Sequence, residues 1–256
     1  MFRRAIVRPP APNFADGLTT VDLGVPDVAK ALDQFERYCE ALEGCGLELV
    51  RLLADPRHPD STFVEDTVIL TERGAILTRP GAPSRQGEVA AIEEAVAWFF
   101  PEPARITAPG TVDGGDVCEA GNHFFIGLSE RTNEEGARQI AAHLERMGYT
   151  SATVDIRGMA GILHLKSGIA APDGLRLVVI DALAAHPAFR GWDLVRVDPA
   201  ENYAANCSRV NDAVLIASGF PKLAGALQAV GLKTIALDMS EFEKMDGGLS
   251  CLSLRF

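Results

Sequence analysis

The chain alternates between two hydrophobic spacings. Short apolar runs, typical of strands, are followed by longer stretches in which apolar residues recur every third or fourth position, as in amphipathic helices. In the first such stretch Val28, Leu32, Phe35, Cys39 and Leu42 would share one helix face. The pattern predicts helices at 26–42, 84–100, 131–147, 221–230 and 240–245, and strands at 2–7, 47–53, 75–78, 123–127, 150–156, 162–165, 175–180, 193–197, 213–217 and 234–237.

These elements recur as a repeat. Five short motifs, centred on Val64, Gly114, His164, Asn206 and Cys251, are separated by 50, 50, 42 and 45 residues. Five units of two or three short strands and one helix account for the 256 residues with little left over. The Gly-x-Gly-x-x-Gly and P-loop patterns are absent from the sequence. We therefore predict one α/β domain spanning residues 1–256, built as a pseudo-fivefold ring rather than a nucleotide-binding sheet.

The C-terminal stretch 247–256 places one cysteine, Cys251, after two glycines and inside a short apolar and polar alternation. Paired glycines let the backbone turn tightly and leave room for another molecule, and the alternation would put Leu249, Cys251 and Ser253 on one strand face. Cysteine is also among the most buried residue types. From this stretch alone Cys251 is either a nucleophile or a small core residue, and the second is the commoner case.

A second stretch, 59–67, holds three carboxylates and Phe63 just before an apolar run. Ionised carboxylates at Asp60, Glu65 and Asp66 can accept the several N–H donors of a guanidinium in paired, charge-assisted hydrogen bonds. The alternative is a solvated loop or the start of a helix, where carboxylates are also common. The stretch is a candidate cation pocket.

His164 lies in a predicted strand and points opposite to the leucines on either side of it. A histidine in such a strand is more often structural than catalytic. The fivefold repeat changes this balance, because equivalent strand ends in a ring converge on its axis. Asp66, Asp113, His164 and Cys251 would then face one central cavity.

Composition narrows the partners and the compartment. The chain has 35 acidic and 24 basic residues, a net charge of −11, so we expect neither nucleic acid nor an anionic membrane as partner, whereas a cationic small molecule is acceptable. An acidic surface can also serve solubility alone. The N-terminal run is broken by Arg8 and two prolines and fits neither a signal peptide nor a membrane anchor. The five cysteines include no C-x-x-C pair, which is typical of free thiols in a cytoplasmic protein.

Taken together, the motifs resemble the dimethylarginine dimethylaminohydrolase family of the guanidine-modifying (pentein) superfamily. The resemblance spans nearly the whole chain and rests on residues 16–19, 60–66, 78–81, 84–85, 113–116, 127, 131–133, 163–166, 204–207 and 247–251. It implies a five-bladed α/β propeller with a central active-site cavity. The length leaves no room for the inserted helical domain of arginine deiminases, and the connector 157–161 is longer than the resemblance implies.

The resemblance also implies roles. Cys251 would be the nucleophile, His164 the general acid/base and Asp113 the acid that orients His164, at a position where some relatives have glutamate. For substrate it implies a guanidinium held by Asp66 with Asp60 and Glu65, a pocket wall at Phe63, carboxylate binding by Arg85 and Arg131, a mobile loop containing Leu18, a backbone carbonyl near Met245 for the α-amine, and further contacts at Asp116 and Ser250.

These residue types suit attack on a guanidinium carbon, which is a poor electrophile because its charge is delocalised. A thiolate is needed, and a bound cation beside Cys251 would lower the pKa of the thiol. The implied reaction converts an Nω-methylated arginine to citrulline and mono- or dimethylamine through a covalent thiouronium intermediate. We expect no organic cofactor and no metal, since the other four histidines lack a metal-ligand spacing.

Two other classes stay open. The first is a different guanidine-modifying enzyme, such as an arginine deiminase or an amidinotransferase. The second is a binding propeller without catalysis, against which the presence of the cysteine, the histidine and the acids counts. The sequence leaves open the Nω substituent and whether the chain forms a homodimer.

Overall fold

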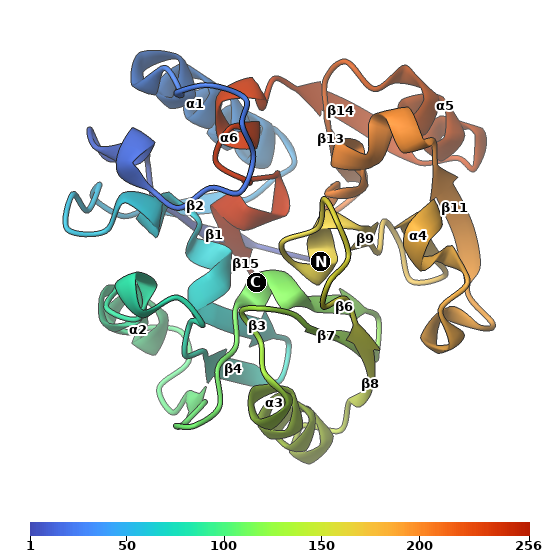
Figure 1. The fold of residues 1–256 in the computed structure, drawn as a ribbon. Coiled ribbons are helices and arrows are strands. Elements are labelled where there is room, and N and C mark those ends of the chain that lie inside the picture. Colours follow the sequence, from blue (N-terminus) through green and yellow to red (C-terminus); the bar gives the residue numbers. More distant parts are fainter.

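Five small three-stranded sheets form a ring in the computed structural model, which describes residues 1–256 (Figure 1). The first blade contains β15 (Ser253–Arg255), β1 (Arg4–Val7) and β2 (Glu48–Arg51), and the second contains β3 (Val68–Thr71), β4 (Gly74–Leu77) and β5 (Ala104–Arg105). The third contains β6 (Val117–Ala120), β7 (His123–Leu128) and β8 (Thr150–Asp155), the fourth β9 (Ile169–Ala170), β10 (Arg176–Ile180) and β11 (Asp193–Val197), and the fifth β12 (Ser208–Val210), β13 (Ala213–Ala217) and β14 (Lys233–Leu237). The predicted pseudo-fivefold α/β propeller is confirmed.

Every blade follows one plan. The inner and middle strands pair antiparallel, and the middle and outer strands pair parallel, as in β6, β7 and β8. A parallel pair requires a crossover connection, and a helix on the rim of the ring supplies it (Figure 1). The five crossover helices are α1 (Val28–Gly44), α2 (Glu88–Ala97), α3 (Glu134–Arg146), α4 (Asp181–Ala184) and α5 (Pro221–Ala229), and α6 (Ser240–Glu243) follows β14. None of these helices combines the length and the apolar character needed to span a lipid bilayer.

Two of the helices, α1 and α3, begin at a capping side chain. Asp27 accepts hydrogen bonds from the first backbone N–H groups of α1, and Asn133 does the same for α3. The predicted helix 84–100 is wrong at its start, because Pro83–Arg85 forms a separate 3-10 turn and α2 begins only at Glu88. The buried side chain of Arg85 turns inward to bond Asp66, which ties this segment to the centre of the ring.

A 3-10 turn precedes the inner strand of every blade. The turns are Val64–Thr67, Gly114–Asp116, Leu165–Ser167, Pro199–Ala205 and Ser250–Leu252. The five sequence motifs lie within these turns or directly beside them. The turn Val64–Thr67 contacts both Gly114–Asp116 and Ser250–Leu252, and Leu165–Ser167 contacts Gly114–Asp116 and Pro199–Ala205. Short turns, rather than strand ends, therefore form the centre of the ring.

Two strand predictions are wrong for this reason. Residues 162–165 form no strand, since Leu165 already begins a 3-10 turn and its backbone N–H donates to Asp116. Cys251 likewise lies in a 3-10 turn, and β15 begins only at Ser253, so these residues share no strand face with Leu249. The Cys251 N–H bonds back to the Gly248 carbonyl and is not available for a sheet ladder.

Candidate active site

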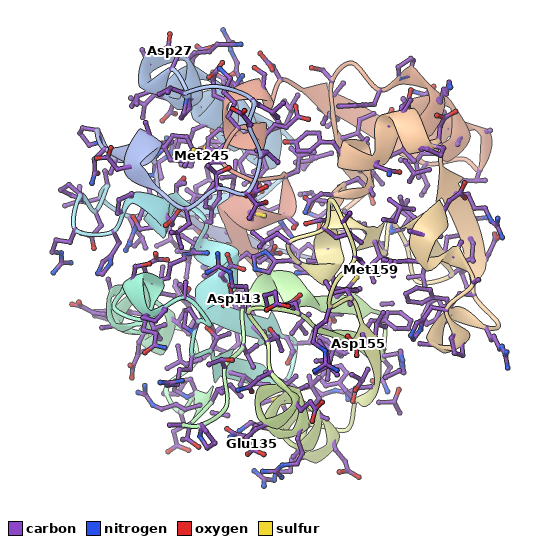
Figure 2. The ribbon with its side chains drawn as sticks, viewed as in Figure 1. Asp27, Asp113, Glu135, Asp155, Met159 and Met245 are labelled. Carbon is purple, nitrogen blue, oxygen red and sulfur yellow. The ribbon has the colours of Figure 1, made fainter.

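One small cavity near the centre of the ring collects side chains from all five blades or the loops beside them. Its volume is about 30 Å³. Asp113 lies close to the centre of the molecule, whereas Asp27 and Glu135 lie at its periphery (Figure 2). The lining contains ten of the predicted site residues, together with Leu163, Asp246 and Gly247: Leu18, Asp60, Phe63, Asp66, Arg85, Asp113, Arg131, His164, Met245 and Cys251.

His164 and Asp113 form a hydrogen-bonded pair. The distance from His164 Nε2 to Asp113 Oδ2 is 3.0 Å, and Asp113 Oδ1 accepts the backbone N–H of Gly81 at 2.8 Å. Burial by itself lowers the pKa of His164, but the nearby carboxylates of Asp66, Asp113 and Asp116 outweigh it and raise this pKa to about 9. The imidazole is therefore protonated at neutral pH and can act as a general acid.

The Cys251 thiol faces the same cavity and is 9% exposed. Burial raises the pKa of this thiol to about 12, and the negative charges of Glu65 and Asp66 act in the same direction. The thiol is neutral as the structure stands. A cation placed in the cavity would stabilise the thiolate, because it would oppose the field of these carboxylates.

Asp66 and Asp60 supply the negative side of the cavity. Asp66 accepts hydrogen bonds from Arg85 Nη1 at 2.5 Å and from the Gly115 N–H at 2.9 Å. Burial alone would raise the pKa of Asp66, but the Arg85 guanidinium holds it at about 2, so this carboxyl is ionised. Asp60 accepts the Leu18 N–H at 3.0 Å, and burial raises its pKa.

The two predicted carboxylate-binding arginines differ in their surroundings. Arg85 is 5% exposed, and it bonds Glu88 through Nε and Nη2 as well as Asp66 through Nη1. Arg131 lines the cavity and is half-buried. Arg85 is thus largely occupied by protein carboxylates, and Arg131 has the less occupied guanidinium.

Phe63 and Met245 form apolar parts of the wall. The Phe63 ring packs on Phe14 and Phe242, with ring centroids 5.9 and 6.3 Å apart. A Cβ atom on Gly247 would collide with the Phe63 ring, and one on Gly248 would lie 2.5 Å from Asn206 Cγ. The two glycines before Cys251 are therefore required by side chains packed against their backbone, and neither has a positive φ.

The segment that carries Leu18 lies against the other side of the cavity. Thr20 donates its N–H and its hydroxyl to Asp246, and Thr19 Oγ1 donates to the Lys244 carbonyl at 3.0 Å. Asp246 has a φ of 56°, which is uncommon for a residue with a side chain. Sequence reasoning missed Asp246, although Asp-Gly at 246–247 is a recognised turn pair.

Asp116 was predicted to contact substrate, but its side chain is fully buried outside the cavity lining. It accepts hydrogen bonds from the hydroxyls of Ser129 and Thr132, each at 2.6 Å, and from the Leu165 N–H at 2.9 Å. Burial raises the pKa of this carboxyl to about 6. Asp116 therefore connects the backbone beside His164 to the loop that carries Arg131.

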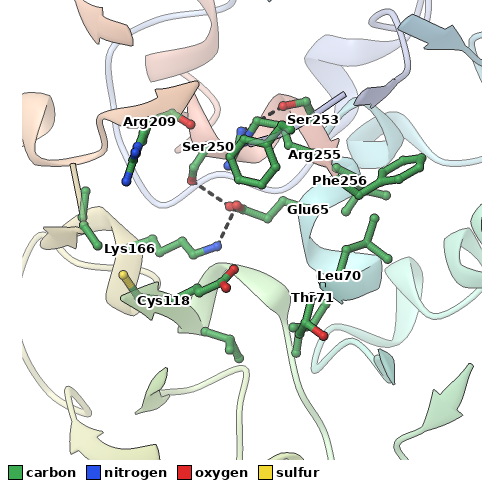
Figure 3. A pocket seen from close by; sticks show the side chains of 18 of the residues that line it. Glu65, Leu70, Thr71, Cys118, Lys166, Arg209, Ser250, Ser253, Arg255 and Phe256 are labelled. Atoms are coloured by element: carbon green, nitrogen blue, oxygen red, sulfur yellow. Dashed lines mark hydrogen bonds and ion pairs between the residues drawn. The ribbon is translucent and has the colours of Figure 1, made fainter. Parts of the chain in front are cut away.

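Glu65 and Ser250 also lie outside the lining of this cavity. Glu65 accepts hydrogen bonds from Lys166 Nζ and from Ser250 Oγ, both at 2.7 Å (Figure 3). The Ser250 N–H donates to Asn206 Oδ1 at 3.0 Å. Lys166 and Asn206 belong to the motifs recognised in the sequence, but no chemical role was predicted for them.

One atom from each of Asp66, Asp113 and His164 lies within 4.8 Å of the others, a spacing that a metal ion can use. Asp66 is already paired with Arg85, and Asp113 with His164.

The chain matches known proteins along its whole length. Residues 45–174 match the family model described as arginine deiminase. The chain is 45% identical to N(G),N(G)-dimethylarginine dimethylaminohydrolase of Pseudomonas aeruginosa over 100% of both chains, and 36% identical to the protein of that name from Streptomyces coelicolor over 99% of this chain and 96% of the relative.

Solved structures of other proteins are similar to this chain in fold. A cysteine-to-serine variant of the Pseudomonas aeruginosa enzyme in complex with citrulline has a TM-score of 0.96 and 45% identity, with 100% of both chains covered. The N-terminal domain of ArgZ, an arginine dihydrolase, has a TM-score of 0.84 at 18% identity, with 100% of this chain and 97% of that chain covered. The second likeness shows a shared fold.

Proposed function

Since this chain belongs to the dimethylarginine dimethylaminohydrolase family, we propose that it hydrolyses Nω-methylated L-arginine to L-citrulline and methylamine or dimethylamine. The observation that carries the proposal is the cavity that brings together Cys251, His164 and Asp113 beside the carboxylate of Asp66. A thiol, a proton donor and a cation-binding carboxylate are the groups that cleavage of a substituted guanidinium requires.

The first step joins Cys251 Sγ to the guanidinium carbon. A methylated guanidinium in the cavity lies against Asp66 and lowers the pKa of the Cys251 thiol by its own charge. The thiol then releases its proton to solvent, because His164 is already protonated, and the thiolate attacks. As the bond between this carbon and the methylated nitrogen breaks, His164 gives its proton to the departing amine. The product of this step is a thiouronium on Cys251 and a free methylamine or dimethylamine.

The second step adds water. Neutral His164 removes a proton from a water molecule that attacks the thiouronium carbon, and the carbon–sulfur bond then breaks to release citrulline and the thiol. Asp113 holds the imidazole through Nε2 in both steps and stabilises its charged form. The citrulline found in the cysteine-to-serine variant of the Pseudomonas aeruginosa enzyme is the product of this sequence.

The choice of leaving group follows from which guanidinium nitrogens the carboxylates bind. Asp66, with Asp60 nearby, binds guanidinium nitrogens that carry hydrogens, so the methylated nitrogen is the one left to depart. Phe63 and Leu18 offer apolar contact for its methyl groups. Arg131 binds the substrate carboxylate, and the Met245 carbonyl accepts from the α-amine. Arg85, which was also expected to bind the substrate carboxylate, instead holds Asp66 in place. Asp116, Glu65 and Ser250 act through the side chains and turns that they hold.

Substrate admission requires movement, because a cavity of about 30 Å³ is far smaller than the several hundred Å³ of a typical ligand pocket. The segment around Leu18 is the part of the wall that can move, since it is exposed and its links are the Asp60, Asp246 and Lys244 contacts. Its displacement would free the Asp60 carboxylate.

The test is citrulline formation from asymmetric dimethylarginine by the Cys251→Ser variant. We expect no detectable turnover, because a serine hydroxyl is a far weaker nucleophile toward a delocalised cation. Cys45→Ser is the matched control, since Cys45 lies outside the cavity and should leave the rate unchanged. Turnover that persists in Cys251→Ser would reject the mechanism.

The match of residues 45–174 to arginine deiminase supports a second candidate, hydrolysis of unmethylated arginine to citrulline and ammonia. Competition between arginine and dimethylarginine in one assay, with ammonia and dimethylamine measured separately, distinguishes the two. We expect dimethylamine to dominate.

We also infer a reducing compartment such as the cytoplasm, because all five cysteines are free thiols. A homodimer stays a prediction, which sedimentation at several protein concentrations tests.

A further inference from the structure

Glu88, the first residue of α2, is a buried carboxylate that the proposed mechanism does not use. It is 1% exposed, and it lines neither the catalytic cavity, which contains Cys251, nor a larger cavity of about 540 Å³, which Glu65 and Ser250 line (Figure 3). Burial of a charged side chain is costly unless a partner compensates it. Glu88 therefore needs a partner inside the protein, and Arg85 supplies it.

Glu88 and Arg85 form an ion pair with two hydrogen bonds. Glu88 Oε1 accepts from Arg85 Nε at 3.0 Å, and Glu88 Oε2 accepts from Arg85 Nη2 at 2.8 Å. A carboxylate that bonds two nitrogens of a guanidinium fixes the plane of that group as well as its position. Glu88 thus determines where the remaining N–H groups of Arg85 point.

Arg85 holds the segment 60–66, which forms one wall of the catalytic cavity. Its Nη2 also donates to the carbonyls of Asp60 and Phe63, at 3.3 and 3.2 Å, and its Nη1 donates to Asp66 Oδ2 at 2.5 Å. Asp60, Phe63 and Asp66 all line the cavity. The orientation that Glu88 gives to Arg85 is therefore passed on to three residues of the guanidinium pocket.

The charge of Glu88 also acts on a cation in the cavity. Asp66 and Arg85 by themselves form a neutral pair, whereas the two carboxylates and one guanidinium of Asp66, Glu88 and Arg85 leave a net negative charge. Each of these side chains is 5% exposed or less, so solvent screens their charges only weakly. An ionised Glu88 compensates Arg85 and leaves the charge of Asp66 to the substrate.

Glu88 changes its charge close to neutral pH. Burial raises its pKa to about 7; Arg85 lowers this pKa, Asp60 and Asp66 raise it, and Arg8 is a second cation near it. As the pH falls from 8 to 6 the carboxyl gains a proton and its negative charge is lost. A cation in the cavity then meets the neutral pair of Asp66 and Arg85.

We propose that Glu88 is a positioning residue for the substrate guanidinium: in its ionised form it orients Arg85 and offsets its charge, so that Asp66 can bind the cation. The inference rests on the proposed function, since it requires a guanidinium in the cavity. The positive charge is present in the bound substrate and in the transition state alike. The contribution of Glu88 therefore belongs to KM and leaves kcat nearly unchanged.

The experiment is citrulline formation from asymmetric dimethylarginine by Glu88→Gln at pH 8. We expect KM to rise roughly tenfold, as when a group that orients a ligand-binding side chain is removed, with kcat within about twofold of wild type. Glu88→Asp keeps the charge and should recover part of the loss. Glu94→Gln is the matched control, since Glu94 is exposed on the same helix and its variant should leave both parameters unchanged.

The pH dependence of KM gives a second readout. The KM of wild type should rise between pH 8 and pH 6 as Glu88 gains a proton, whereas the KM of Glu88→Gln should change little over this range. A role of Glu88 in stability alone would leave the pH dependence of KM the same in both proteins. The wild-type measurement needs no variant, so it tests the proposal even if Glu88→Gln is unstable.

A binding measurement separates the role of Glu88 from the hydrolysis itself. Calorimetric titration of Cys251→Ser with asymmetric dimethylarginine requires no turnover, and the added change Glu88→Gln should weaken affinity by the same roughly tenfold factor. If wild type forms no citrulline but this loss of affinity is found, the hydrolysis is rejected and the role of Glu88 stands. Normal hydrolysis with equal KM in Glu88→Gln and wild type, or a wild-type KM that is constant from pH 8 to pH 6, would overturn the role of Glu88.

Discussion

At the scale of single residues, the site holds its two reacting groups in their protonated forms. His164 is charged because carboxylates surround it, and Cys251 is neutral because burial and the same carboxylates oppose a thiolate. The charged imidazole is the form of His164 that the first step needs, whereas Cys251 must first lose its proton when a cation is bound. The carboxylates thus keep His164 protonated, whereas only the charge of the bound substrate can lower the pKa of the Cys251 thiol.

The protonation of His164 predicts how kcat/KM changes at alkaline pH. Its folded-state pKa of about 9 lies above the ordinary 6.5, so the charged imidazole stabilises the fold below pH 6.5 and this contribution is lost as the pH rises through about 9. Above this pH the leaving amine has no proton donor. We expect kcat/KM to fall with an apparent pKa near 9, measured by citrulline formation across buffers of constant ionic strength.

Asp113→Asn should move the alkaline fall in kcat/KM to lower pH, because it removes a hydrogen bond and a charge that raise the pKa of His164. The rate at neutral pH should fall roughly 10²-fold or more, as when general acid–base catalysis is impaired. Asp113→Glu keeps a carboxylate and should keep the apparent pKa of this fall near its wild-type value. An unchanged apparent pKa in Asp113→Asn would show that a group other than His164 determines it.

The residue types of the site were predictable, but their pairing was not. Arg85 was expected to bind the substrate carboxylate, and the structure shows its guanidinium bonded to Asp66 and Glu88. Glu88 is three residues from Arg85 in the chain, so a helical-spacing argument could have suggested this pair. Asp66 lies in a different turn, and only the folded ring brings it within 2.5 Å of Arg85.

At the scale of elements, the 3-10 turns position the side chains of the site. At most two residues separate each turn from the inner strand that follows it. Adjacent residues of a turn can line different cavities, as Ser250 and Cys251 do. Strands were predicted at 162–165 because alternating apolar and polar residues suit a strand. The carboxylate of Asp116 takes the Leu165 N–H instead, and the pattern could not show this because the two residues are far apart in sequence.

The turn before Cys251 depends on close packing at Gly247. Gly247→Ala places a methyl group against the Phe63 ring and the Phe242 carbonyl, so we expect a loss of about 1–3 kcal/mol in the free energy of unfolding and a lower kcat. Gly225→Ala is the control, since Gly225 is exposed in α5 with open space around its Cα and should be neutral or stabilising by about 0.5–1 kcal/mol. Urea unfolding of both variants measures the difference. Equal effects would show that Gly247 is not restricted by packing.

At the scale of the whole molecule, the two ends of the chain close the ring. β15 from the C-terminus pairs antiparallel with β1 from the N-terminus, with Ala5 opposite Arg255, and β1 pairs with β2. The nucleophile lies in the turn immediately before β15. Closure of the propeller and placement of Cys251 therefore depend on the same strand.

Leu254 tests this dependence. It is 4% exposed in β15 and lies opposite Ile6, so Leu254→Ala should cost about 2–5 kcal/mol of stability by leaving a cavity at the closing strand. Leu175→Ala, at a residue that is 71% exposed, should change stability by about 0.5 kcal/mol or less. Thermal unfolding followed by circular dichroism checks both. A small effect of Leu254→Ala would mean that ring closure contributes little to stability.

The sequence by itself determined the repeat, the middle strands, four of the five crossover helices and the types of chemical group near the axis, because hydrophobic spacing and motif spacing are local properties of the chain. It did not predict the short inner strands 68–71, 117–120, 169–170 and 208–210 or the helix Asp181–Ala184. The resemblance added roles for those groups. Only the tertiary structure decided which neighbours face which cavity, since this depends on how five turns from distant parts of the chain pack together. For that reason Asp66 and Cys251 meet in one cavity, while Glu65 and Ser250, one position earlier in each turn, line the other.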